Sequence, residues 1–117
     1  MSRSIRDYLQ DIIEAASAAI EFIRELSFEE FEADKKTTFA VARSLQIIGE
    51  AAKKIPDPVR NNYPEIPWKG MAGMRDKVTL EYFGVNLKVV WETIHQDLPL
   101  LLDLMPRIID DLEKGNE

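Results

Sequence analysis

The chain has 117 residues, of which 45% are hydrophobic and 31% are charged, and it carries a formal net charge of −6 at pH 7. The length suits one folded domain spanning residues 1–117, and the composition excludes an intrinsically disordered chain. Because the sequence contains no cysteine and no apolar run near the roughly 20 residues that span a bilayer, it excludes disulfides and thiolate sites, and we expect a soluble, cytoplasmic protein.

Helical periodicity dominates the first half of the chain. Apolar residues recur at three- and four-residue steps from Ile5 to Ile23, which predicts an amphipathic helix over about 4–25. Ser27, followed by two glutamates, predicts a capped, short acidic turn. The same apolar spacing predicts another helix over about 36–54.

A connector rich in proline follows. Residues 56–67 contain four prolines, and each proline lacks an amide donor and restricts the residue before it. We therefore expect at most one short helical turn there, near 57–63. The next helix is predicted to begin near Trp68 and to end at Phe83-Gly84, where glycine readily adopts a left-handed C-terminal turn.

Two helices are predicted for the rest of the chain. The apolar spacing of residues 87–94 indicates one of them, and Asp97 with Pro99 resembles a cap and first-turn pair that opens the other. Pro106 falls inside this last pattern and predicts a kink or a break. Because no segment alternates with a period of two, we predict an all-α, up-and-down bundle of about five helices.

The charge is unevenly distributed along the chain. Residues 1–34 and 89–117 are acidic, whereas residues 35–88 hold ten basic and five acidic side chains. A polyanionic partner needs local positive potential, and this middle segment can supply it. Solvated surface lysines and arginines are the alternative interpretation, and both remain open.

The helix predicted from Trp68 onward has one apolar stripe. At about 100° per residue, Met71, Met74 and Val78 share a face that we expect to be core. Arg75 and Tyr82 lie on or beside this stripe. Since an unpaired buried guanidinium is very costly, Arg75 must be paired, or must face a cleft or a partner subunit.

Leu80 is the exception on the opposite face of the same helix. That face is otherwise polar, because it also carries Lys69, Asp76 and Lys77. A leucine there is a harmless exposed side chain, a contact with another helix or chain, or the replacement of a functional polar residue. Spacing does not decide among these three readings.

Several segments together resemble one family. The segments WKGMAGMRD (68–76), EYFGVN (81–86), IIGEAA (47–52) and QDLP (96–99) are similar to the HepT-like HEPN domains, and the resemblance covers nearly the whole chain. It implies a helical-bundle toxin of a prokaryotic toxin–antitoxin pair that acts as a metal-independent endoribonuclease without a cofactor. It also implies a homodimer with its active cleft at the subunit interface, an RNA substrate and a small nucleotidyltransferase as antitoxin.

The family signature is an arginine, a polar residue, three further residues, a histidine, one residue and a tyrosine. Arg75 matches the arginine, Asp76 matches the polar residue that supports it, and Tyr82 matches the tyrosine to which the antitoxin adds AMP. The position of the histidine is occupied by Leu80.

This departure changes what the resemblance implies about activity. Without a metal, RNA cleavage needs one group to take the 2′-hydroxyl proton and another to protonate the leaving oxygen. Imidazole does either near neutral pH, whereas leucine does neither. Arg75 can still bind a phosphate through its planar donors. We therefore expect an impaired or inactive nuclease, with a non-catalytic module that binds a nucleotidyltransferase or RNA as the alternative.

Other candidate sites are weaker. Glu92 and His95 have the spacing used in di-metal carboxylate bundles, but the chain lacks a second Glu-x-x-His motif, so a surface histidine is the favoured reading and no metal is expected. Gly70 and Gly73 do not form a phosphate-binding loop, because no lysine followed by serine or threonine comes after them.

The tryptophans and the acidic helices have ordinary explanations as well. Trp68 and Trp91 are interpreted as core or interface anchors rather than as platforms for base stacking. The acidic faces of the first and last helices are read as solvated surface, with docking of a basic antitoxin as the alternative.

Overall fold

A computed structural model describes residues 3–73 and 86–115 of the chain. Its helices are α1 (Ile5–Ile23), α2 (Phe28–Ala33), α3 (Lys35–Lys53), α4 (Asp57–Asn61), α6 (Leu87–Gln96) and α7 (Leu98–Gly115). Residues 68–73 are also helical, and no strand occurs in the described ranges. The predicted all-α fold is confirmed, and the bounds predicted for α1 and α3 are correct to within two residues at each end.

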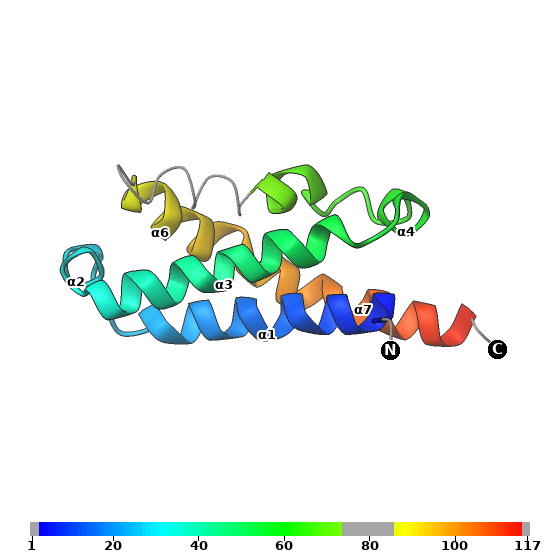
Figure 1. The fold of residues 1–117 in the computed structure, drawn as a ribbon, viewed down its shortest axis with the longest axis horizontal. Coiled ribbons are helices and arrows are strands. Elements are labelled where there is room, and N and C mark those ends of the chain that lie inside the picture. Colours follow the sequence, from blue (N-terminus) through cyan, green and yellow to red (C-terminus); the bar gives the residue numbers. More distant parts are fainter. Residues whose placement is uncertain (1–2, 74–85, 116–117) are drawn as a thin grey trace.

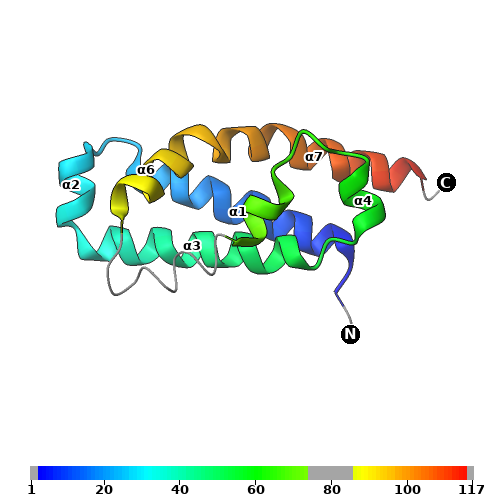
Figure 2. The same ribbon diagram turned by 90° about the horizontal axis from the view of Figure 1, so that it is seen from above.

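Three long helices form the body of the bundle. α1 and α3 lie side by side and run in opposite directions, and α7 packs along α1 on the side away from α3 (Figure 1, Figure 2). The buried core lies among these helices, and its largest side chains include Leu9, Ile12, Phe31, Val41, Ile48, Ile94, Leu101, Met105 and Ile108. Within the described residues, no helix combines the length and the apolar character needed to cross a membrane.

The acidic turn predicted after the first helix is α2, and its cap is reciprocal. The Ser27 hydroxyl accepts a hydrogen bond from the Glu30 amide at 3.1 Å, while the Glu30 carboxylate accepts one from the Ser27 amide at 2.9 Å. These two bonds satisfy amide donors that the first turn of a helix leaves open. The cap by Ser27 was predicted from the sequence, whereas the reciprocal bond to the Glu30 carboxylate was not.

The cap of α3 was not predicted. Asp34 accepts hydrogen bonds from the Thr37 amide at 3.3 Å and from the Thr37 hydroxyl at 2.8 Å. The hydroxyl bond, followed by the backbone bond, holds the pKa of Asp34 below its usual range. Because the folded-state pKa is lowered, the stabilisation is present above the unfolded pKa of about 4 and disappears as the pH falls through the folded value.

α7 continues without interruption through Pro106. A kink or a break was predicted at Pro106, and the break does not occur. A proline removes one amide donor from the helix ladder, but Leu104, Met105 and Ile108 are buried around it. We infer that burial of this apolar face compensates for the lost hydrogen bond.

The connector between α3 and residue 68 is hydrogen-bonded to α7. The Tyr63 hydroxyl donates a hydrogen bond to Asp111 on α7, a residue far away in the sequence. Burial, together with this hydrogen bond, raises the pKa of Tyr63 to about 12. The bond requires the protonated phenol, so its stabilisation is present below the unfolded pKa of about 10 and is lost as the pH rises toward 12.

We expect one of the three tyrosines to ionise near pH 12 in the folded protein. Ultraviolet absorbance of tyrosinate during alkaline titration measures this ionisation. The Tyr63→Phe variant should lack the late absorbance step, which is the one near pH 12. Tyr8→Phe serves as the control and should keep it. A late step that survives Tyr63→Phe would contradict the assignment.

Candidate functional site

The four residues singled out by the motif lie in one short segment. Arg75, Asp76, Leu80 and Tyr82 fall between residues 74 and 85, outside the described residues. Met74 and Val78, predicted as core, fall there as well. The structure does describe how the chain enters and leaves this segment, and these two attachments define the setting of the candidate site.

The entry is anchored in the core. Trp68 is buried, with 7% of its surface exposed, and its indole Nε1 donates a hydrogen bond to the Tyr63 carbonyl at 3.1 Å. Three residues later, Met71 is completely buried, and its amide donates to the Pro67 carbonyl at 2.9 Å. The predicted helix start and the core roles of Trp68 and Met71 are confirmed.

A single arginine links the end of α3 to this entry. Arg60 Nε donates to the Ile55 carbonyl at 2.8 Å, Arg60 Nη2 donates to the Ala52 carbonyl, and the guanidinium lies 5.9 Å from the centre of the Trp68 ring. The last carbonyls of a helix have no partner within the helix, so Arg60 acts as a side-chain cap of α3. This role of Arg60 was not predicted from the sequence, because an arginine shortly after a helix end is only a weak signal for a cap.

The exit from the segment is the start of α6. The Asn86 side chain caps this helix by accepting a hydrogen bond from the Val89 amide at 3.3 Å. One turn further, the half-buried Trp91 ring packs on Phe31 and Phe28, with ring centres 5.4 and 5.9 Å away. Trp91 therefore acts as a packing anchor in the chain, as its spacing predicted, and it holds α6 against α2.

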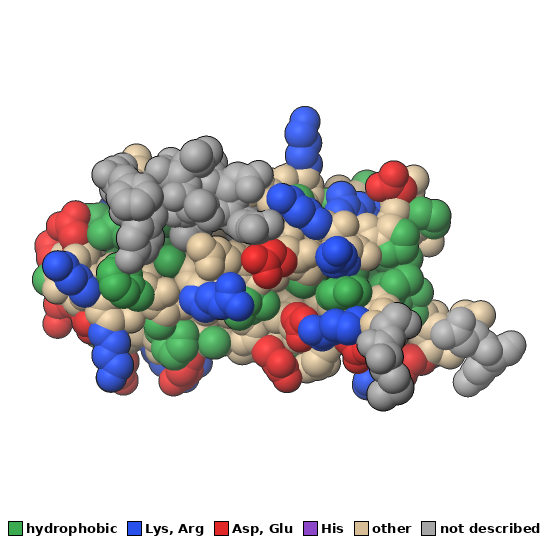
Figure 3. Space-filling model, viewed as in Figure 1, with side chains coloured by type: hydrophobic (Ala, Val, Ile, Leu, Met, Phe, Trp, Pro, Cys, Tyr) green, Lys and Arg blue, Asp and Glu red, His purple; other side chains and the backbone are tan. Residues whose placement is uncertain are grey.

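Three exposed lysines lie in the part of the chain that leads into the candidate segment. Lys53 and Lys54 are exposed at the end of α3, and Lys69 is exposed on the helical residues that lead into position 74. Lys and Arg side chains are visible over the face made by α1 and α3 and along its upper edge (Figure 3). Lys69 therefore places an exposed cation on the helical residues that lead into the candidate segment, although the whole chain is acidic.

His95 lies at the end of α6 and is exposed. Its Nδ1 is 2.8 Å from the Trp91 carbonyl oxygen, and its ring centre is 4.5 Å from that of Trp91. Because a carbonyl only accepts, Nδ1 carries the proton in this contact. Among the described residues, no group of three or more histidine, cysteine, aspartate or glutamate side chains is placed to hold a metal ion. Within that part of the chain, Glu92 and His95 therefore have no further ligands with which to form a di-metal site.

Comparison with known proteins identifies the family to which the chain belongs. The chain matches the ribonuclease HepT-like family over residues 7–108. It belongs to the HepT-like ribonucleases. It is 54% identical over 101 residues to "Probable ribonuclease HepT" of Thermococcus cleftensis, which covers 86% of this chain and 92% of that protein. It is also 42% identical over 115 residues to "Putative RNase MJ0127" of Methanocaldococcus jannaschii, covering 98% and 95%.

The family resemblance drawn from the motifs is therefore confirmed. The matched range includes the whole segment from Arg75 to Tyr82, so the HepT-like region contains every predicted site residue. No solved structure is significantly similar to the chain.

Proposed function

We propose that this HepT-like chain is the toxin of a prokaryotic toxin–antitoxin pair, built as a metal-independent endoribonuclease, and that Leu80 impairs its activity. The observation that carries the proposal is the arginine and tyrosine signature at Arg75 and Tyr82 within a chain matched to a ribonuclease family. The names of the relatives, which are those of ribonucleases, support RNA as the substrate.

The proposed roles follow from side-chain chemistry. Arg75 binds the scissile phosphate and stabilises the charge that builds up on it, because its planar guanidinium donates two parallel hydrogen bonds. Asp76 orients that guanidinium. Position 80 is where a histidine would move protons during the reaction, and the leucine side chain has no proton to donate and no lone pair to accept one. No cofactor or metal enters this chemistry.

Exposed cations near the segment support binding of a polyanion. Lys54 and Lys69 lie at the end of α3 and on the helical residues that lead into position 74. Cations at such a surface bind phosphates in a manner that weakens as salt increases. In the proposed function these lysines attract the RNA backbone, and Arg75 acts on the RNA phosphodiester that is cleaved. The proposed active form of the protein is a homodimer.

The proposed antitoxin is a small nucleotidyltransferase that transfers AMP to Tyr82. We expect incubation with ATP and the nucleotidyltransferase from the neighbouring gene to add the mass of one AMP to the chain. Mass spectrometry of the intact protein and its peptides measures this. Tyr82→Phe should abolish the addition, and Tyr63→Phe should not. Addition at another tyrosine, with none at Tyr82, would contradict the proposal.

A second candidate function is a binding module without catalysis, favoured by the leucine at position 80. The two candidates are separated by incubating RNA, in the presence of a chelator, with the chain and with its Leu80→His variant. The nuclease proposal expects cleavage to rise in the variant. A folded variant that binds RNA and leaves it intact would favour the binding module.

A further inference from the structure

The three long helices of the bundle differ in charge. α3 with its C-cap residue Lys54 holds five basic side chains and one acidic side chain, whereas α1 holds one basic and four acidic side chains. α7 holds two basic and four acidic side chains. The positive charge of these helices is therefore concentrated on α3.

Three cations of α3 lie in one row along the helix. At about 100° per residue, Arg43 and Lys54 point within about 20° of the direction of Lys36. At a rise of about 1.5 Å per residue, the row from Lys36 to Lys54 is about 27 Å long. All three side chains are exposed. We call Lys36, Arg43 and Lys54 the basic row.

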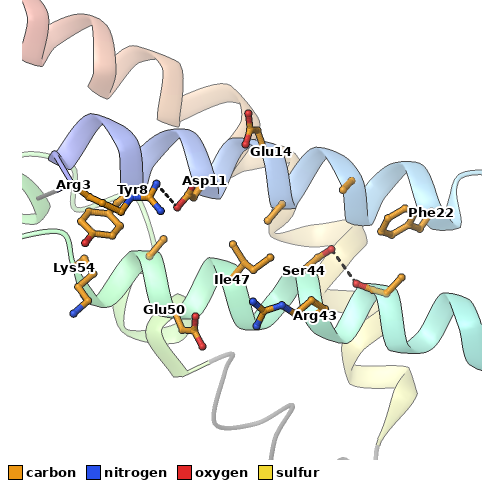
Figure 4. A pocket seen from close by; sticks show the side chains of 14 residues that line it. Arg3, Tyr8, Asp11, Glu14, Phe22, Arg43, Ser44, Ile47, Glu50 and Lys54 are labelled. Atoms are coloured by element: carbon orange, nitrogen blue, oxygen red, sulfur yellow. Dashed lines mark hydrogen bonds and ion pairs between the residues drawn. The ribbon is translucent and has the colours of Figure 1, made fainter. Parts of the chain in front are cut away.

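Glu50 is the acidic side chain of α3 and lies beside the basic row. Figure 4 shows Lys54, Glu50 and Arg43 in this order along the helix. Glu50 is half-buried and has an interaction of its own within the chain. With three cations against one carboxylate, the row keeps a net positive charge.

The basic row differs from the cations of the acidic helices in its partners. Every arginine and lysine of α1 and α7 is paired with a carboxylate of the same chain, and these pairs are Arg6–Glu113, Arg107–Asp103 and Lys114–Asp110. Among the described residues, no carboxylate forms an ion pair with the basic row. Arg43 makes only a long hydrogen bond, of 3.5 Å, to the neutral Gln46 side chain. The row is therefore available to an external anion.

The basic row borders a groove of about 690 Å³ between α1 and α3. Arg43 and Lys54 line its α3 edge, and Ile47 contributes apolar surface (Figure 4). Tyr8 lies at one end of the groove, and Phe22 lies at the other end with 44% of its surface exposed. α7 packs on α1 from the other side (Figure 2), so the residues that line the groove come from α1, α3 and their flanks.

The two edges of the groove have opposite net charge. The α1 edge carries Asp11 and Glu14 (Figure 4), and only Asp11 has a printed cationic partner among the described residues, Arg3 at 2.7 Å. A phosphate backbone is attracted by the α3 edge and repelled by the α1 edge. A nucleic acid strand in the groove therefore lies with its phosphates over α3 and its bases toward α1, where the Phe22 ring is exposed.

We propose that the groove between α1 and α3 binds a single strand of RNA, with its phosphates on the basic row and a base stacked on Phe22. The proposal rests on RNA as the ligand in the proposed function, and it extends the phosphate contacts from Lys54 along the whole of α3. A cationic track beside an aromatic ring is typical of proteins that bind single strands. With one phosphate per about 3.4 Å, about eight phosphates fit along the row.

The salt dependence of binding tests the phosphate contacts. The probe is a labelled 2′-O-methyl RNA of about 12 nucleotides, long enough to cover the row and unable to lose a 2′-hydroxyl proton in cleavage. Each phosphate contact of a single strand contributes about 0.7 to the slope of log binding constant against log salt. Lys36→Gln with Arg43→Gln should therefore lower this slope by about 1.4, measured by fluorescence anisotropy.

The matched control removes the same charge from another helix. Arg107→Gln with Lys114→Gln takes two cations from α7, outside the groove. This double variant has the same net charge as the first and should keep the slope of the unchanged chain. Circular dichroism verifies that both double variants are folded.

Removal of the aromatic ring should have a different effect. Phe22→Ala is expected to weaken RNA binding at least about fivefold, the lower limit for loss of one stacked base, without changing the salt slope, because the ring carries no charge. Leu100→Ala removes a side chain of α7 that is also exposed, at 38%, and is the control. It should leave both the affinity and the slope unchanged.

Several results would overturn the proposal. These are an unchanged chain that does not bind the RNA, equal slopes in the two double variants, or equal affinity in Phe22→Ala and Leu100→Ala. Binding of polyglutamate as tightly as RNA would also overturn it, because it would indicate an acidic protein as the partner. Since none of these measurements involves cleavage, their failure leaves the proposed nuclease centre untouched, and a Leu80→His chain that fails to cleave leaves the groove untouched.

Discussion

RNA cleavage by the Leu80→His variant is expected to exceed that of the unchanged chain by about 10²–10⁴-fold, the usual contribution of one positioned general acid or base. The signature places the proton-transferring histidine at position 80, where the chain has leucine. The gain should persist in the presence of a chelator, because the proposed chemistry uses side chains alone. Single-turnover cleavage of a labelled RNA measures it.

The pH profile distinguishes imidazole chemistry from a structural effect. A histidine with a pKa near 6.5 changes its protonation between pH 5 and 8, so the rate of the Leu80→His variant should bend within this range. Leu80→Asn introduces a polar side chain that does not titrate there, and it is the matched control. We expect it to cleave as slowly as the unchanged chain. Equal gains in the two variants, with no bend in either profile, would contradict the assignment of position 80.

Phe31→Ala is expected to lower the free energy of unfolding by about 3–5 kcal/mol, the usual cost of removing a large aromatic side chain from a core. Phe31 is the one buried residue of α2 and is completely inaccessible. Its ring lies 5.4 Å from that of Trp91 on α6. The substitution therefore leaves a cavity where α2, α3 and α6 meet. Urea denaturation followed by circular dichroism measures the loss.

The control for this substitution lies next to it in the sequence. Glu32 is exposed on the same short helix, and Glu32→Ala is expected to change the free energy of unfolding by no more than about 0.5 kcal/mol. A loss in Phe31→Ala no larger than the loss in Glu32→Ala would show that α2 contributes little to the core. The urea dependence should be similar in the two variants, so that the midpoints report stability.

The helices could be predicted because their signals are local. The apolar spacing between Ile5 and Ile23 determines the inward face of α1, and Ser27 with its glutamate spacing determines the start of α2. Pro106 predicted either a kink or a break, and the sequence of α7 alone could not decide between them, because burial of the residues around Pro106 depends on α1. Arg60 as the cap of α3 was missed for the same reason, since its acceptors are the Ala52 carbonyl of α3 and the Ile55 carbonyl just after that helix.

The candidate site was predictable only as a set of residues. The motif names Arg75, Leu80 and Tyr82, and the family match includes them, but their positions lie outside the described residues. The groove between α1 and α3 could not be predicted, because it depends on how two antiparallel helices are aligned. Nothing in the local sequence places Tyr8 and Arg43 on opposite sides of Ile47 along one surface.

Cleavage by Leu80→His chains with and without Arg75→Ala, measured on the same RNA with a chelator present, tests the proposed nuclease centre most directly. We expect the single variant to cleave and the double variant to lose nearly all of that activity while circular dichroism and dimerisation stay unchanged. Arg75→Lys should recover only a small part, because lysine lacks the planar pair of donors. Equal cleavage with and without Arg75, or a folded, dimeric Leu80→His chain that leaves RNA intact, would contradict a nuclease centre at residues 75–82.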